Sequence, residues 1–115
     1  MSEAVNDVGI PYSRVESALA FLARTDEPVA GLKADVLRSK AKIEAAKAAI
    51  ILHVDGTGPV KQAEAQIHRT VRDAEEWYFQ AVHKHEAMKN ERERNDKVIE
   101  VWRSVSSAKN HGQIL

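Results

Sequence analysis

Basic side chains recur at a seven-residue interval in the first half of the sequence. Lys33, Lys40 and Lys47 fall on one line along any helix that contains them, because seven residues are close to two helical turns. Other basic residues flank this line or follow a tryptophan near the C-terminus, namely Arg38, Lys42, Arg103 and Lys109. Cations beside aromatic rings suit the phosphates and bases of single-stranded DNA or RNA. The alternative is that these side chains border a helix seam and pair with a neighbouring helix.

Two other groups of side chains have the residue types of an active or metal site but not its spacing. His83 and His85 are two residues apart and point in different directions on a helix, whereas helical zinc pairs are four residues apart. Asp73, Glu75 and Glu76 could work as an acid–base pair only in a desolvated cleft, which a helical rod does not offer. We therefore predict no metal, no cofactor and no enzymatic activity.

The composition favours exposed helices. The 115 residues are 43% hydrophobic and 30% charged, and only 5% are aromatic. The net charge of zero argues against strong nonspecific binding to duplex DNA. Without cysteine there is no disulfide framework and no thiolate zinc site. No apolar run approaches the ~20 residues of a membrane span, and no secretory signal begins the chain, so we expect a cytoplasmic protein without membrane contact.

The N-terminal part predicts an arm followed by a short helix. Residues 1–12 are polar and contain a glycine and a proline, which indicates a flexible or docked arm. Ser13 and Glu16 have the spacing of a capping box, and apolar residues then recur on one face. These features predict a helix over 14–24, at the start of a helical domain over 13–108.

A second helix is predicted over 27–54. Thr25 or Asp26 can cap it, and Pro28 is tolerated in a first turn. Apolar residues at alternating intervals of three and four form a core seam, which includes Val29, Leu32, Val36, Ile43 and Ile50.

A turn and a long third helix follow. Gly56 can adopt the left-handed conformation that closes a helix, and Thr57 can cap the next one. No glycine or proline interrupts 59–107, so we predict a helix there, either continuous or bent near Glu91–Lys97, and a tail over 109–115. Its core seam includes Ile67, Val71, Tyr78, Ile99 and Trp102, and continues weakly through Arg92 and Asn95.

These elements predict an all-α fold. The short turn at Gly56 makes the two long helices an antiparallel, coiled-coil-like hairpin, accompanied by the short N-terminal helix. Trp77, Tyr78 and Phe79 cannot all face one narrow seam. We therefore expect the hairpin to assemble into an oligomeric bundle.

The C-terminal part resembles a family of small uncharacterised proteins of tailed bacteriophages and prophages. The resemblance is carried by the run Ile99–Ser104, which contains a Trp-Arg pair, and by Ser107–Ile114; it extends from about Leu32 onward, through a hairpin and the charged stretch Lys89–Lys97. The tail is less basic than is typical of this family. The resemblance implies a protein of the early phage genome region, acting in the bacterial host. The layout also looks like that of phage recombination mediators, which are helical, oligomeric and load recombinases on single strands.

The leading hypothesis is an oligomeric accessory protein of phage DNA recombination or replication. It would contact single-stranded DNA or a recombinase through the basic residues named above. The alternatives are an adaptor or inhibitor that binds only a host protein of defence or regulation, and a virion assembly component.

Overall fold

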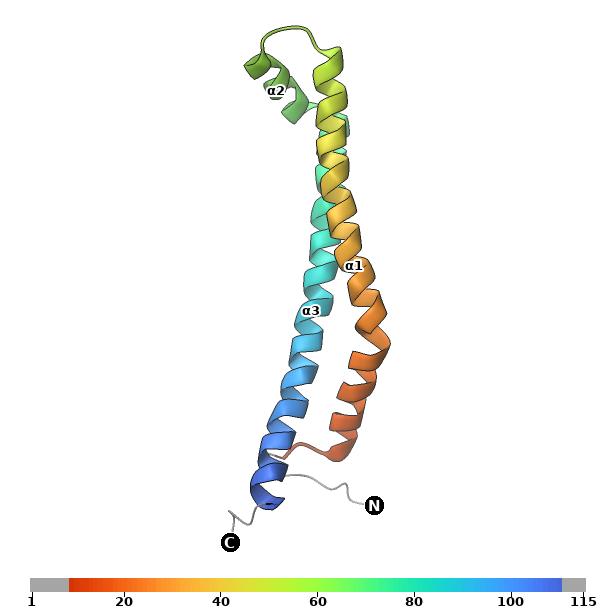
Figure 1. Ribbon diagram of the computed structural model, residues 1–115, viewed down its shortest axis with the longest axis vertical. Coiled ribbons are helices and arrows are strands. Elements are labelled where there is room, and N and C mark those ends of the chain that lie inside the picture. Colours follow the sequence, from red (N-terminus) through yellow and green to blue (C-terminus); the bar gives the residue numbers. More distant parts are fainter. Residues whose placement is uncertain (1–8, 111–115) are drawn as a thin grey trace. The chain divides into compact units, whose positions relative to one another are not determined.

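The computed structural model describes residues 9–110, which form three α-helices: α1 (Tyr12–His53), α2 (Gly58–Ile67) and α3 (Arg69–Asn110) (Figure 1). The predicted all-α hairpin is confirmed. The predicted arm and tail fall mostly outside the described residues, except for 9–11, which precede α1, and 109–110, which end α3.

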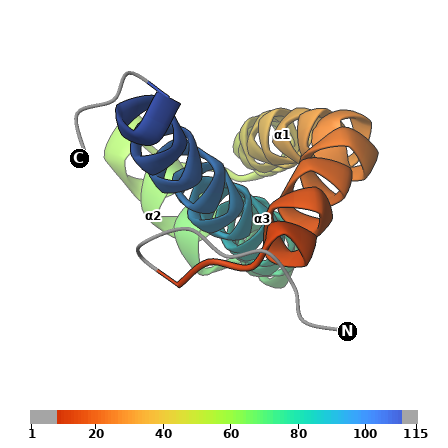
Figure 2. The ribbon, with the colours of Figure 1, turned by 90° about the horizontal axis from the view of Figure 1, so that it is seen from below.

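The chain divides into two compact units, and α1 and α3 each contribute to both. One unit joins the residues up to Pro28 with those from Met88 onward, and the other is the continuous stretch Val29–Ala87. We call them the terminal unit and the central unit. In each unit a stretch of α1 lies antiparallel to a stretch of α3, and Figure 2 shows the terminal unit end-on.

The predicted break between two N-terminal helices is wrong, because α1 continues from Tyr12 to His53 with Pro28 inside it. Proline cannot donate to the carbonyl four residues earlier and disfavours a helix interior by about 3 kcal/mol. Tertiary contacts of the preceding turn oppose that cost. Thr25 is buried and donates its hydroxyl to the Phe21 carbonyl at 2.6 Å, so it lies inside the helix and not at its start.

The helix predicted over 59–107 is interrupted at His68, between α2 and α3, and not near Glu91–Lys97. His68 has an extended backbone with φ −67° and ψ 136°. Its imidazole Nδ1 accepts a hydrogen bond from the Thr70 N–H at 3.2 Å, and its carbonyl accepts one from the Arg72 N–H at 3.0 Å. His68 thus occupies the N-cap position of α3, a role usually filled by Ser, Thr, Asp or Asn.

The turn before α2 agrees with the sequence. Gly56 has φ +125°, and Thr57 is the N-cap residue of α2. The Thr57 carbonyl accepts the Lys61 N–H at 2.9 Å, while its side chain makes no cap hydrogen bond. The chain therefore reverses where the glycine predicted it.

The terminal unit has a small apolar core between α1 and α3. Tyr12, the first residue of α1, packs its ring against that of Trp102 with 5.8 Å between the centroids. Val15, Ala18 and Ile99 are buried, and around them pack Ile10, Leu22, Val98 and Trp102. Ile10 belongs to the predicted arm, so the described end of that arm is docked on this core.

A polar layer lies beside this core, at the positions where the predicted seam is weak. Arg92 donates to the Leu22 carbonyl at 2.9 Å and to the Thr25 hydroxyl at 2.6 Å, and its guanidinium lies 3.6 Å from the Asp26 carboxylate. Asn95 is 7% exposed; its side-chain oxygen accepts from Arg14 at 3.0 Å, and its amide donates to the Glu91 carbonyl at 2.8 Å. Every polar group of this layer thus has a partner, as burial requires.

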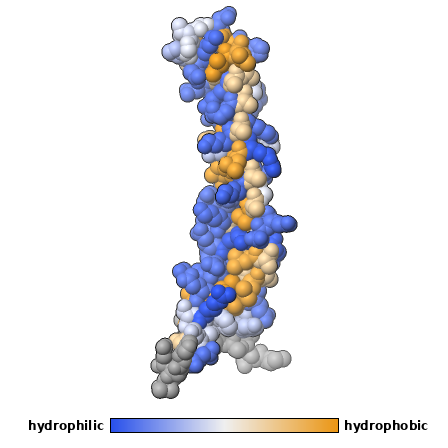
Figure 3. Space-filling model, viewed as in Figure 1, coloured by the Kyte–Doolittle hydropathy of each residue, from blue (hydrophilic) through white to orange (hydrophobic). Residues whose placement is uncertain are grey.

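The central unit also has a small apolar core. Its buried hydrophobic residues are Ile43, Ala65 and Val71. The other seam residues of this unit are half-buried, namely Val29, Leu32, Val36, Ile50 and Tyr78, whereas Ile67 is 69% exposed because the chain leaves the helix directly after it. Figure 3 shows apolar surface over α1, between polar side chains. The large hydrophobic side chains that are exposed in this unit are Leu37, Leu52, Val60, Ile67, Trp77 and Phe79.

Candidate nucleic-acid interface

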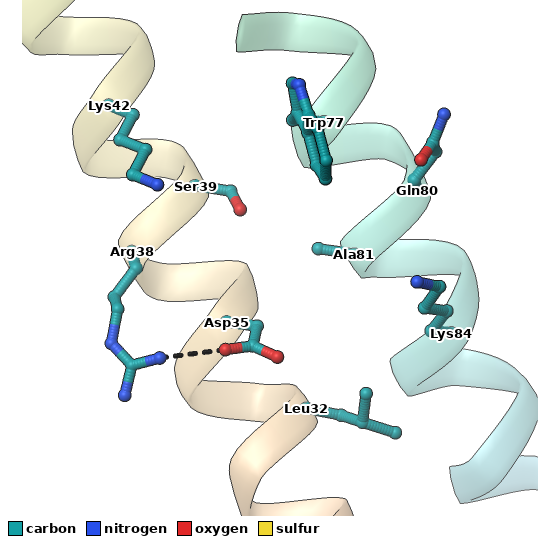
Figure 4. A pocket seen from close by; sticks show the side chains of 9 residues that line it. All are labelled: Leu32, Asp35, Arg38, Ser39, Lys42, Trp77, Gln80, Ala81 and Lys84. Carbon is teal, nitrogen blue, oxygen red and sulfur yellow. Dashed lines mark hydrogen bonds and ion pairs between the residues drawn. The ribbon is translucent and has the colours of Figure 1, made fainter.

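A groove runs between α1 and α3 in the central unit. Its volume is about 240 Å³, and it is open to solvent. Figure 4 shows the nine side chains that line it, five from α1 and four from α3: Leu32, Asp35, Arg38, Ser39 and Lys42, and Trp77, Gln80, Ala81 and Lys84. Both helices supply an apolar floor with polar and charged borders.

Trp77 is the largest side chain in this groove and is 68% exposed. It also borders a second hollow, lined by Ser39, Lys42, Thr70, Asp73, Ala74 and Trp77. The two hollows share Ser39, Lys42 and Trp77. The two hollows are therefore neighbours, and Trp77 borders both.

The charge of the groove is mainly positive. Arg38 is paired with Asp35, with 2.8 Å between Nη1 and Oδ1 (Figure 4). Neither Lys42 nor Lys84 forms an ion pair among the described residues, and both are exposed. Two cations, one from each helix, thus stand on either side of an exposed aromatic ring.

The lysine line lies on another side of α1. Lys40 is two residues from both Arg38 and Lys42, which places it about 200° around the helix from each of them. Lys33 and Lys40 are exposed, and Lys47 is half-buried. The structure therefore separates the basic residues predicted to act together: Arg38 and Lys42 line the groove, and the lysine line does not.

The basic residues near the C-terminus belong to the terminal unit. Arg103 and Lys109 are exposed on α3. The neighbouring Trp102 is half-buried against Tyr12 and the apolar core. This tryptophan packs in the core, which was one of the two roles its spacing allowed.

Sequence reasoning missed two residues of the groove, Trp77 and Lys84. A signal was present, because these two residues are seven apart and so share one face of α3 with Ala81 between them. The aromatic run Trp77–Phe79 indicated that some of its rings must face away from the seam. It did not indicate that the outward ring would lie opposite Lys42.

Among residues 9–110, no group of three or more His, Cys, Asp or Glu side chains is placed to hold a metal ion. Within the same residues, no helix combines the length and the apolar character needed to cross a bilayer. No protein-family model, no curated protein and no solved structure matches this chain.

Proposed function

We propose that this protein is a non-catalytic accessory factor of phage DNA recombination or replication that binds single-stranded DNA through the groove at Trp77. The observation that carries this proposal is an exposed indole flanked by Lys42 and Lys84. Single-strand binding sites combine these two features, since bases of any sequence stack on aromatic rings while cations contact the backbone. The phage role rests on the resemblance of the C-terminal half.

A self-associated form is part of the proposal. The central unit buries few large side chains and exposes six, including Leu52 at 81% and Ile67 at 69%. Apolar side chains grouped on one unit mark an interaction surface more often than singly scattered ones do. Light scattering of the purified protein should give a discrete oligomer, and a monomer at all concentrations would refute this part.

The DNA part is tested by the anisotropy of a labelled single-stranded oligonucleotide at low and moderate salt. We expect binding that weakens as salt rises, because each phosphate contact releases counterions. The charge-reversed pair Lys42→Glu and Lys84→Glu should lose binding. The matched pair Lys33→Glu and Lys40→Glu removes the same charge from another side of α1 and should bind as the unchanged protein does.

A protein-only adaptor is the second candidate function. It is favoured by the zero net charge together with Leu37, 61% exposed, and Leu52, both on α1. In that case a host protein would be recovered in stoichiometric amount after nuclease treatment, and Leu37→Glu would abolish its recovery. Absence of oligonucleotide binding at low salt together with that result would replace the DNA proposal.

A further inference from the structure

We infer that the groove at Trp77 is a subsite for one stacked base of a single strand, whose neighbouring phosphates contact Lys42 and Lys84. The inference rests on the proposed single-strand binding and specifies where the strand lies, how long its footprint is and how few charges hold it. Each of these three properties follows from the lining of the groove.

The position of the base follows from the orientation of Trp77. In Figure 4 the indole is seen edge-on, with one face toward α1, where Ser39 and Lys42 lie. A base lying on that face would have the indole on one side and the Lys42 side chain on the other. Both hollows border this ring, so the strand can enter along one and leave along the other.

The footprint follows from the length of the two neighbouring hollows. On α3 they extend from Thr70 to Lys84. Fourteen residues at 1.5 Å rise cover about 21 Å. At 3.4 Å per stacked nucleotide this length accommodates about six nucleotides. The affinity should therefore rise with oligonucleotide length up to about six nucleotides. Beyond that length it should rise only because a longer strand offers more positions at which the protein can bind.

Among the charged side chains that line the two hollows, Lys42 and Lys84 form no ion pair with another described residue, and Lys42 lines both hollows. Arg38, Lys42 and Lys84 line the first hollow, where Asp35 already neutralises Arg38. The second hollow carries Asp73, whose carboxylate lies 3.9 Å from Arg69. Lys42 and Lys84 would thus neutralise two phosphates. In single strands each such contact contributes about −0.7 to the slope of log affinity against log salt concentration, so we expect a slope of about −1.4.

Phe79 supplies the matched aromatic control. It is exposed on the same helix, at 58%, and does not line the groove at Trp77; the hollow that it borders shares Gln80 and Lys84 with that groove. Phe79→Ala removes an exposed ring without changing the lining of the groove at Trp77. A stacking subsite at Trp77 predicts that only the tryptophan substitution affects binding.

The test uses the fluorescence of Trp77 in a Trp102→Phe background, since the chain has two tryptophans. Oligothymidylates and oligouridylates of two to twelve nucleotides are titrated at low salt. We expect quenching that saturates, with an affinity plateau near six nucleotides. Trp77→Ala should weaken binding about tenfold to a hundredfold, and Phe79→Ala less than threefold. If Trp102→Phe does not fold, the difference in quenching between the unchanged protein and Trp77→Phe gives the same signal.

The outcomes separate this inference from the proposed function. Binding seen by anisotropy but without quenching, and unchanged in Trp77→Ala, overturns the subsite and leaves single-strand binding in place. No binding of any oligonucleotide by the unchanged protein overturns both. Equal affinity for the two oligonucleotide series supports stacking alone, and a preference for one identifies that nucleic acid as the ligand. Circular dichroism of each variant confirms that its helices are retained.

Discussion

Replacing Arg92 by methionine should destabilise the terminal unit by about 3 kcal/mol. Methionine keeps an unbranched apolar stem and removes the guanidinium that bonds to the Leu22 carbonyl and the Thr25 hydroxyl. Hydrogen bonds from a charged donor contribute about 1.5–3 kcal/mol each. We expect the lower end of the sum of the two contributions, because the Thr25 hydroxyl still donates to the Phe21 carbonyl after the substitution. The ion pair with Asp26 adds little, because that carboxylate is 81% exposed.

The measurement is urea unfolding followed by circular dichroism. At a slope of about 1–3 kcal/mol per molar, the expected loss lowers the midpoint by roughly one to three molar. Protein concentration is held constant, because association would add to the apparent stability. Arg94→Met is the control: Arg94 is exposed two residues away, so its replacement should change stability by less than about 0.5 kcal/mol.

A double-mutant cycle with Thr25→Val isolates the contact itself. The two side chains share a 2.6 Å hydrogen bond, so their effects should not add, and the coupling should exceed about 0.5 kcal/mol. Additive effects, or an Arg92→Met protein as stable as the unchanged one, would refute the idea that this arginine anchors the turn before Pro28.

Three further substitutions test local geometry. Gly56→Ala should destabilise by at least about 1 kcal/mol in thermal unfolding, because φ is +125° and a Cβ would lie 3.1 Å from Val60; an unchanged midpoint would contradict this. Pro28→Ala should raise stability by about 1–3 kcal/mol, because Pro28 is exposed within a helix, and a lower midpoint would mean that the proline is required. His68→Ala should cost about 0.5–2 kcal/mol and His68→Asn should restore most of it, since asparagine can accept the Thr70 N–H; equal effects of both variants would exclude capping.

The sequence predicted the parts of the fold that depend on periodicity. The seam positions in α1 and the turn at Gly56 are where spacing and glycine placed them. The errors came from local rules that tertiary contacts override. Pro28 indicated the start of a helix, but α1 continues through this residue. The turn before it is anchored by Arg92 of α3, which donates to the Leu22 carbonyl. His68 carries no breaker signal, because a histidine seldom acts as a cap.

The candidate site was less predictable. Helical geometry alone put the lysine line on one side of α1, but only the packing of α3 shows which side faces a groove. Arg38 and Lys42 lie there because Leu32 and Ser39 face Ala81 and Trp77 across it. Arg92 and Asn95 appeared as weak seam positions, and the structure shows them as a satisfied polar layer. Their partners on α1 are more than sixty residues away in the sequence, which no local pattern encodes.

The division of the chain into two units has a consequence for its synthesis. The central unit is one continuous stretch, Val29–Ala87, whereas the terminal unit joins segments from before and after it. On the ribosome, the first turns of α1 emerge long before their partners, since Arg14 and Asn95 are 81 residues apart. Val15 and Ala18 therefore stay exposed to solvent until Ile99 has been synthesised. Because local contacts form sooner than distant ones, the central hairpin should form first. Its formation should then bring the late-synthesised part of α3 next to the first turns of α1.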